Sequence, residues 1–238
     1  TAVGTGFQAP EGLAEAAAEI LSDKLGKTIT IASDPLVYMA GRPAVTDVMG
    51  RLNNLAVELH RISNDIRMMA SGPRLGLGEI TIPSLQPGSS IMPGKVNPVV
   101  CESMVQISMA VAGYNTMVGI AAMGGQFELN VTFPITAYAF LGAIEILSNG
   151  SETFRTKLVE GIEVRTGDVE KGLDKSLALA TALISKIGYS EAAKVAVLAH
   201  EKGITVAEAA VKTGVLEDSE VKDWLNPEKL VKKGRLTD

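Results

Sequence analysis

The chain has 238 residues, of which 46% are hydrophobic, so it can bury a substantial core in one or two domains. Its net charge of -5, with no Lys/Arg run longer than Lys232-Lys233, argues against a nucleic-acid-binding surface. The single cysteine, Cys101, excludes an internal disulfide and a zinc site built from clustered cysteines.

The sequence also argues against a metal site and a transmembrane helix. His60 and His200 are the only histidines, and neither has a partner at metal-binding spacing, so we expect no metal and no cofactor. No window approaches the ~20 uninterrupted apolar residues of a transmembrane helix. We therefore expect a soluble, cytoplasmic protein that does not contact a membrane. Because the chain opens in a Gly/Thr-rich loop without an initiator Met, we also expect it to be part of a longer protein.

The first half of the chain predicts long helices. Apolar residues on one stripe predict a helix over 11–26 that stops at Gly26, followed by a loop or brief strand in "KTITIAS". The strongest pattern predicts a rod of roughly 40 Å over 44–70, which needs a second long helix beside its narrow seam. The seam residues recur at alternating spacings of three and four: Val45, Val48, Leu52, Leu55, Leu59, Ile62, Ile66 and Met69.

A long loop and two further helices are predicted next. Residues 72–97 are rich in Gly and Pro, and a loop longer than about 12 to 15 residues is usually functional or disordered. Residues 98–123 are apolar almost all round, which predicts a helix buried at the centre of a bundle. A third long helix is predicted from about 131 to 161, with Pro134 in its first turn. Its expected inner face comprises Phe133, Ala137, Phe140, Leu141, Ile144 and Leu147.

Beyond Glu163 the predicted helices become short and capped. They cover 173–187, 190–202 and 205–213, ended by Gly188, Gly203 and Gly214, and Thr205 with Glu208 forms a capping box. Asn226-Pro227 opens a last turn. The sequence therefore predicts an all-α protein with two domains. The first is a long-helix bundle, 1–162, carrying the loop 72–97, and the second is a small helical domain, 163–238.

The loop ends in "PGSSIMPGKVNP", residues 87–98. Asn97 before Pro98 predicts a helix start with Asn97 as the N-cap, and a helix N-terminus attracts anions. Lys95 adds a full positive charge close by, and the glycines let the backbone approach a ligand. From residue types alone, a plain connector and an anion site are about equally expected.

The order of residues favours the anion site. The stretch matches the signature G-S-x-x-M-x-x-K-x-N of the fumarase/aspartase superfamily at Gly88, Ser89, Met92, Lys95 and Asn97. "TAVGTG", "ASGPRLGLGEI", "GQFELNV" and "IGYSEAA" resemble stretches of class II fumarases in the same order. The resemblance covers essentially the whole chain but only the C-terminal portion of a full-length member, so the N-terminal domain of the family would be absent.

The resemblance implies a metal-free, reversible elimination of water from malate that gives fumarate, a reaction of the tricarboxylic acid cycle. Ser89 would be the base. Ser90, Lys95, the backbone of Val96, and Asn97 would bind the substrate carboxylate and stabilise the aci-carboxylate intermediate. Glu102 would pair with a catalytic histidine that lies in an upstream motif which this chain does not contain.

The family assembles its active site from several subunits of a homotetramer joined through a helix bundle. The resemblance therefore implies that this chain is inactive by itself. His60, His200 and Cys101 are interpreted as structural. Two alternatives remain open: an aspartate ammonia-lyase or related fumarate-releasing lyase, and a non-catalytic helical assembly fragment.

Overall fold

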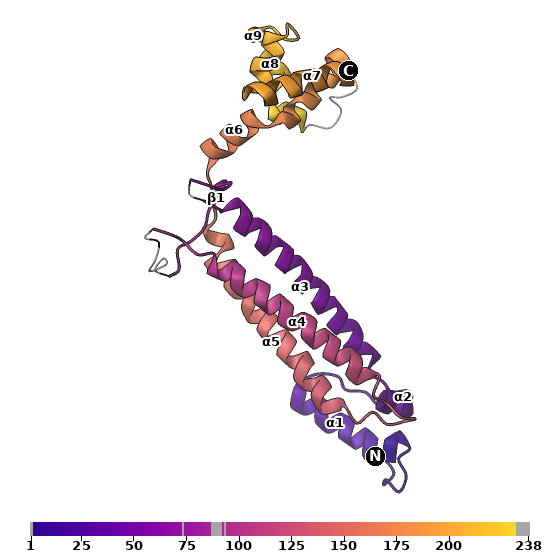
Figure 1. Ribbon diagram of the computed structural model, residues 1–238. Coiled ribbons are helices and arrows are strands. Elements are labelled where there is room, and N and C mark those ends of the chain that lie inside the picture. Colours follow the sequence, from indigo (N-terminus) through magenta and orange to yellow (C-terminus); the bar gives the residue numbers. More distant parts are fainter. Residues whose placement is uncertain (1, 73, 87–91, 93, 232–238) are drawn as a thin grey trace. The chain divides into compact units, whose positions relative to one another are not determined.

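The structure is a computed structural model that describes residues 2–72, 74–86, 92 and 94–231 (Figure 1). The predicted all-α class is confirmed, since the only strands in this described part are two pairs of residues. The chain divides into two compact units, one formed by 1–70 with 82–162 and the other by 71–81 with 163–238. The helices of four or more residues are α1 (Leu13–Leu25), α2 (Pro35–Ala40), α3 (Pro43–Met69), α4 (Val99–Ala122), α5 (Phe133–Lys157), α6 (Thr166–Lys175), η3 (Leu177–Leu183), α7 (Ile184–Lys202), α8 (Val206–Lys212), α9 (Asp218–Trp224) and α10 (Pro227–Leu230).

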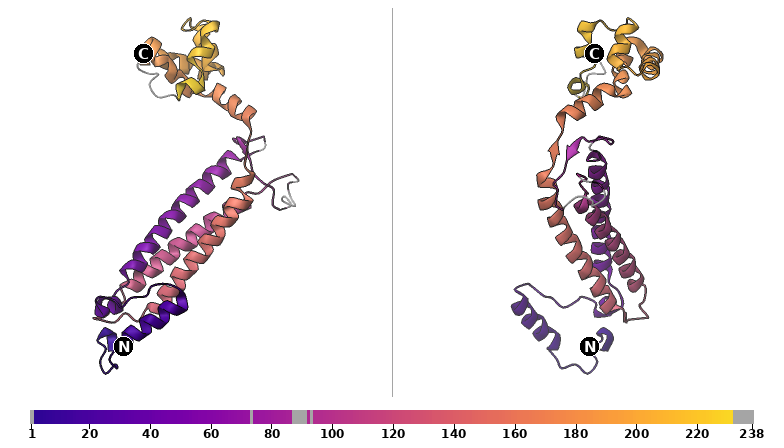
Figure 2. Two further views of the ribbon diagram at one scale, coloured as in Figure 1. Left: turned by 180° about the vertical axis from the view of Figure 1, so that it is seen from behind. Right: turned by 60° about the vertical axis from the view of Figure 1, so that its left-hand side comes forward.

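The first unit is built on three long helices, with α4 packed against both α3 and α5 (Figures 1 and 2). Pro43 and Pro134 stand in the first turns of α3 and α5, where the missing N–H costs nothing. Small side chains let the helices approach closely. The buried cluster that joins the three helices consists of Met49, Ala56, Val111, Val118, Ala139, Ala143 and Leu147.

The predicted rod over 44–70 is present as α3, but its apolar seam is divided between two surfaces. The face toward the core carries Met49, Ala56, Ser63 and Ile66. Val48, Leu55 and Ile62, each seven residues from the next, stay 42%, 48% and 38% exposed. An α-helix has 3.6 residues per turn, so a neighbouring helix covers one face and leaves the adjacent stripe open.

The expectation that the helix over 98–123 is buried all round is wrong for this single chain. Met109 and Ile120 on α4 are each 61% exposed, because α3 and α5 cover only two of its sides. Among the described residues, α4 alone is long and apolar enough to pass for a membrane span. It carries Glu102, Gln106 and Asn115, however, and packs as the middle helix of a bundle.

The expected inner face of the third long helix is wrong for three of its six residues, whereas Leu147 is buried and Phe140 packs against the buried cluster. Leu141 is 62% and Ile144 is 39% exposed, and Phe133 is 56% exposed. The core side of α5 instead carries smaller residues, because a close helix crossing leaves little room for large ones. Of the expected residues only Leu147 is buried; the buried set is Thr136, Ala139, Ala143, Leu147, Gly150 and Phe154.

A buried asparagine, Asn130, joins the end of α4 to the residues just before α5. The Nδ2 of Asn130 donates to the carbonyl oxygens of Ala121 at 3.1 Å and Ala122 at 3.4 Å. Its Oδ1 accepts from the N–H of Thr132 at 2.9 Å, and its own N–H donates to the carbonyl of Met39 at 3.1 Å. Asn130 thus supplies a donor to two of the last carbonyls of α4, which lie beyond the regular helix ladder. The carbonyl of Ala121 also accepts from the N–H of Gly124 at 3.1 Å and from the hydroxyl of Thr132 at 2.6 Å.

The second unit begins with a two-stranded antiparallel ladder. β1 (Ile80–Thr81) pairs with β2 (Glu163–Val164), and the N–H of Arg165 donates to the carbonyl of Glu79 at 2.8 Å. Residues 71–81, which fall within the expected first domain, therefore group with 163–238. Within the first half of the loop 72–97, Ile80 and Thr81 are held by pairing with β2.

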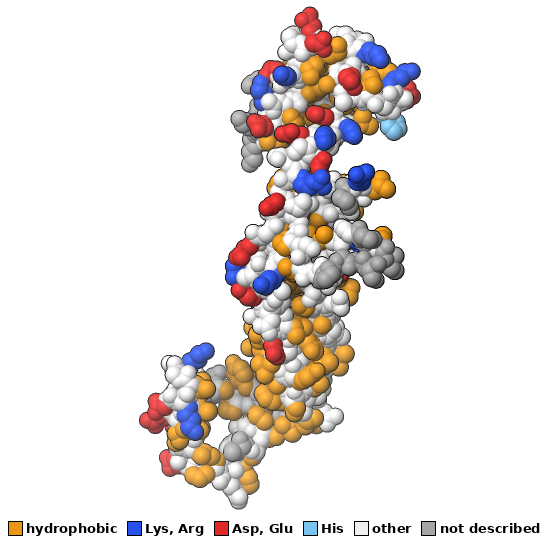
Figure 3. Space-filling view, turned by 90° about the vertical axis from the view of Figure 1, so that its left-hand side faces the viewer, with side chains coloured by type: hydrophobic (Ala, Val, Ile, Leu, Met, Phe, Trp, Pro, Cys, Tyr) orange, Lys and Arg blue, Asp and Glu red, His pale blue; other side chains and the backbone are white. Residues whose placement is uncertain are grey.

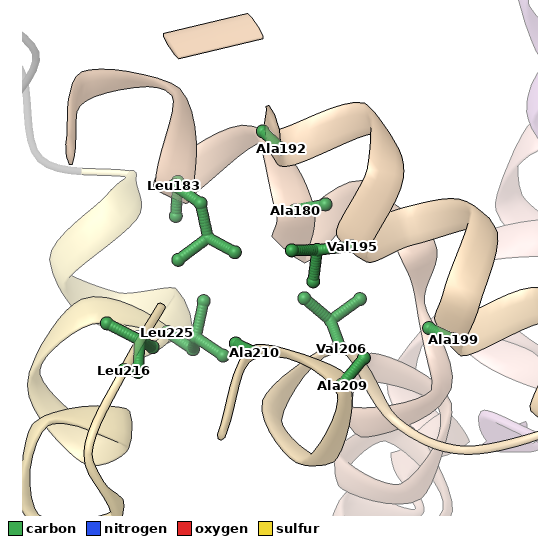
Figure 4. Packing of buried hydrophobic residues seen from close by; sticks show 11 residues of the cluster. Ala180, Leu183, Ala192, Val195, Ala199, Val206, Ala209, Ala210, Leu216 and Leu225 are labelled. Atoms are coloured by element: carbon green, nitrogen blue, oxygen red, sulfur yellow. The ribbon is translucent and has the colours of Figure 1, made fainter. Parts of the chain in front are cut away.

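The remaining helices of the second unit surround one core (Figure 4). The predicted capping box of Thr205 and Glu208 is confirmed, and the Asn226 side chain caps α10 as expected. The expected helix over 173–187 is wrong, since α6 ends before Ser176, whose extended backbone starts the 3-10 helix η3. The buried core residues are Ala180, Ala182, Leu183, Ala192, Val195, Ala199, Val206, Ala209, Ala210, Leu216 and Leu225.

Candidate functional site

The candidate site lies where the long loop runs into α4. Ser89 and Ser90 fall within residues 87–91, which lie outside the described residues. Of the other predicted residues, Lys95 is exposed, Val96 is 45% exposed and Asn97 is half-buried. The N–H of Lys95 donates to the carbonyl of Met92 at 3.2 Å, which forms a turn before the helix.

The predicted N-cap is wrong by one residue. α4 begins at Val99, and Pro98, with φ -79° and ψ 56°, takes the N-cap position without a side-chain cap. The main-chain carbonyl of Asn97 accepts the N–H of Val99 at 2.9 Å, while the N–H of Glu102 donates to the carbonyl of Pro98 at 3.0 Å. No described helix N–H is capped by the Asn97 amide side chain.

Lys95, Asn97 and the start of α4 form a group of positive character. Lys95 takes part in none of the ion pairs found among the described residues. An ammonium, an amide donor and the partial positive charge of a helix N-terminus together favour an anion such as a carboxylate. The structure therefore brings together three predicted site residues, Lys95, Val96 and Asn97, at one helix start.

Glu102 lies half-buried in the first turn of α4, one residue after the buried Cys101. Burial raises the pKa of the Cys101 thiol to about 11, while the nearby positive charge of Arg67 acts in the opposite direction. A thiol of such pKa stays protonated at neutral pH, so Cys101 behaves as a small core residue. Glu102 is the acidic residue in the first turn of α4.

Arg67 was not singled out from the sequence. It lies in the last turn of α3, and its Nη1 donates to Asn64 Oδ1 at 3.2 Å. Its charge acts on Cys101 because the end of α3 packs beside the start of α4. In the sequence, 34 positions separate the two residues, so only the packing of the helices brings them together.

The two histidines lie on different helices, α3 and α7. His60 is half-buried on α3 beside Leu59, and His200 is exposed in the last turn of α7. In the described part of the chain, no group of three or more His, Cys, Asp or Glu side chains is placed to hold a metal ion.

Comparisons with known proteins agree with the signature. The family described as "Lyase" matches residues 1–113, and the family described as "Fumarase C C-terminus" matches residues 179–232. "Fumarate hydratase class II" of Caulobacter vibrioides is 42% identical over 234 residues, which are 98% of this chain and 50% of that protein. The enzyme of the same name from Bacillus subtilis is 41% identical over 232 residues, again 98% of this chain and 50% of the relative.

Two solved structures are similar over nearly the whole chain. The fumarate lyase:delta crystallin from Brucella melitensis bound to cobalt has a TM-score of 0.90 at 38% identity, covering 98% of this chain and 50% of its own. The recombinant class II fumarase from Schistosoma mansoni has a TM-score of 0.88 at 32% identity, covering 97% and 51%. This chain thus spans about half the length of the curated relatives it matches, and over that span it is similar to the C-terminal portion of class II fumarases.

Proposed function

We propose that the protein containing this chain is a fumarate hydratase, which interconverts malate and fumarate plus water. One observation carries the proposal: the complete signature at Gly88, Ser89, Met92, Lys95 and Asn97 lies directly before α4. The chain that carries it is 41–42% identical to class II fumarate hydratases.

In the proposed reaction, Ser89 as its oxyanion removes a proton from the malate carbon next to a carboxylate. The electron pair moves into that carboxylate and gives the doubly charged aci-carboxylate. When the pair returns, the carbon–carbon double bond forms and the hydroxyl on the neighbouring carbon leaves, protonated by an acid, as water. A serine hydroxyl is a very weak acid, so its oxyanion needs neighbouring N–H groups and positive charge.

Lys95, Asn97 and the backbone of Val96 would bind the carboxylate on which this charge develops, together with Ser90. The exposed ammonium of Lys95 and the amide of Asn97, two residues on, support this role. Their effect on rate requires that they bind the doubly charged intermediate more tightly than malate. Glu102 would orient a histidine from another part of the protein and favour its protonated form. Neither His60 nor His200 would take the place of that histidine.

We propose a homotetramer assembled through the long helices. The stripe of Val48, Leu55 and Ile62 on α3 supports this, because a heptad stripe left open in one chain is what a helix from another copy would cover. Met109 and Ile120 on α4 are also exposed, and Figure 3 shows hydrophobic side chains gathered over the long helices. We place the assembled enzyme in the cytoplasm as a soluble protein.

The test of activity uses the longest natural protein that contains this chain, with fumarate followed by its ultraviolet absorbance. We expect turnover of malate, and we expect the 238-residue chain alone to be inactive. Ser89→Ala should reduce kcat by at least about a hundredfold, since it removes the base. Lys95→Met should reduce kcat/KM by a similar factor, whereas the matched Lys24→Met on α1 should change neither constant.

The outcomes separate the alternatives. Turnover of aspartate with release of ammonia, and none of malate, would identify an aspartate ammonia-lyase instead. Full activity in Ser89→Ala would refute the assigned base. If neither substrate is consumed by a tetramer of normal helix content, the non-catalytic assembly role replaces the hydratase.

A further inference from the structure

A groove of about 570 Å³ opens in the second unit, away from the signature loop in the sequence and lined by residues of that unit alone. This volume is in the range of pockets that take a small ligand or a short peptide segment. Its apolar lining includes Leu173, Leu179, Val221 and Leu225.

The polar lining of the groove is mainly acidic. Glu170 and Asp174 lie one turn apart on α6, and Glu228 lies in the first turn of α10. Among the described residues that line the groove, Lys222 is the only cation, and it is exposed. The ion pairs found in the described part of the chain include none of the three carboxylates. Like charges at i and i+4 destabilise a helix by a few tenths of a kcal/mol, so a cationic occupant would relieve α6.

The chain itself supplies a segment of the opposite charge. Residues 232–238, "KKGRLTD", follow the described part and carry Lys232, Lys233 and Arg235 with one acidic residue, Asp238. Leu236 adds an apolar side chain. Lysine and arginine can lay their aliphatic stems on an apolar floor while their charged ends reach carboxylates at the rim. The charge of Asp238 is opposite to that of Lys222.

The position of α10 brings this segment to the groove. Asn226, Pro227 and Glu228 line the groove, and α10 continues for only about 6 Å before Val231. The helix is held in place, because Leu230 packs on the core of the unit and Lys229 pairs with Asp223. Seven extended residues span up to about 25 Å. A segment tethered so closely has an effective concentration in the millimolar range, which favours it over a free peptide.

We propose that residues 232–238 dock into this groove of their own chain, with the lysine and arginine side chains against Glu170, Asp174 and Glu228. The segment would then complete the surface of the second unit and neutralise the carboxylates of α6 and α10. The proposal is independent of the catalytic assignment, because it uses no residue of the signature loop.

The test is zero-length carbodiimide cross-linking of the full 238-residue chain, which joins a lysine to a carboxylate in direct contact. Digestion and mass spectrometry should find Lys232 or Lys233 bonded to Glu170, Asp174 or Glu228. Mixed ¹⁴N and ¹⁵N chains should give cross-linked peptides of one isotope only. Cross-links of mixed isotope would assign the groove to a second copy, and the absence of any cross-link to the three carboxylates would overturn the proposal.

Variants make the result specific. Glu170→Gln with Asp174→Asn should lower the cross-linking yield at Glu228 at least about fivefold, because the tethered segment loses two of its three charge partners. The matched Glu201→Gln, on the exposed side of α7, should leave the yield unchanged. Charge exchange, with Glu170→Lys and Asp174→Lys combined with Lys232→Glu and Lys233→Glu, should restore cross-linking at inverted positions. Failure of this rescue in a variant of normal helix content would also refute the docking.

Discussion

The two units of the chain bury their apolar residues in different ways. In the second unit, the short helices converge on a core that includes Leu183, which is 0% exposed, and Val206, which is 1% exposed. In the first unit, α3, α4 and α5 bury a cluster that includes Met49, Val111 and Leu147. They leave Leu55, Met109 and Leu141 about half exposed or more. A helix bundle with three helices in a row has two broad outer faces, whereas helices packed around a centre leave few apolar side chains outside.

This difference indicates where each unit obtains its stability. The second unit has its own core and is expected to fold by itself, whereas the first unit is expected to need other copies to cover its helices. Two natural probes separate the units: Cys101, the only cysteine, lies in the first, and Trp224, the only tryptophan, lies in the second. Thiol labelling and tryptophan fluorescence can therefore follow the units in one sample.

The largest effect is expected for Leu55→Glu. A carboxylate placed on the exposed stripe of α3 would have to be buried against another copy, which costs several kcal/mol. We expect assembly to weaken by at least about a hundredfold, equivalent to about 2.7 kcal/mol, while the helix content stays unchanged. Sedimentation velocity measures the loss. Asn54→Glu, on the neighbouring exposed position, is the control, and an intact assembly in Leu55→Glu would show that this stripe is not an interface.

The next effect is expected for Leu183→Ala in the second unit. Removing a fully buried leucine leaves a cavity and should cost about 2–5 kcal/mol. Urea unfolding followed by Trp224 fluorescence should show the loss, while labelling of Cys101 keeps its rate. The control is Leu177→Ala, which is 39% exposed and should cost less than about 1 kcal/mol. Equal shifts of both probes would show that the units unfold together.

A smaller effect is expected for Asn130→Ala in the first unit. The change removes the Nδ2 donor to the carbonyls of Ala121 and Ala122 and the Oδ1 acceptor of the Thr132 N–H, which should cost about 1–3 kcal/mol. Because the thiol of Cys101 is buried and its pKa is raised to about 11, labelling at pH 8 requires local opening. We expect faster labelling in this variant and an unchanged rate in Asn54→Ala. An unchanged rate in Asn130→Ala would mean that the far end of α4 opens independently.

The smallest effect is a dependence on pH in the second unit. The backbone N–H and hydroxyl of Thr205 hold the pKa of Glu208 below its usual range, and Lys186 lowers the pKa of Glu220. A carboxyl with a lowered folded pKa stabilises the fold above its unfolded pKa, about 4.3, and this stability is lost as the pH falls through the folded pKa. The free energy of unfolding of the second unit, followed by Trp224 fluorescence, should therefore decrease below about pH 4.

Glu208→Gln tests the origin of this slope. The variant should be slightly less stable at pH 7, since a neutral amide binds the N–H of Thr205 less strongly. Its stability should fall less steeply between pH 5 and pH 3 than that of the unchanged chain. Parallel curves for the two proteins would place the acid sensitivity at other carboxyls.

The sequence by itself determined much of the local structure. Heptad spacing predicted α3, Pro134 marked the start of α5, and the pair Thr205 and Glu208 marked the start of α8. These features depend on residues a few positions apart, whose backbone hydrogen bonds and steric limits act within one or two turns. The signature also indicated which loop carries the candidate site. This was possible because the signature is a set of residue types at fixed positions within one short stretch of the chain.

The tertiary structure alone decided which faces are buried and what stands beside the site. Val48 and Met49 are neighbours of similar hydrophobicity, yet one is 42% exposed and the other 0%. Their exposed fractions differ only because of where α4 packs against α3. Likewise, the N-cap of α4 is Pro98 and not the predicted Asn97. The charge of Arg67 acts to lower the pKa of Cys101, which the sequence did not indicate. Burial depends on partners distant in the sequence, and no spacing within a single helix contains that information.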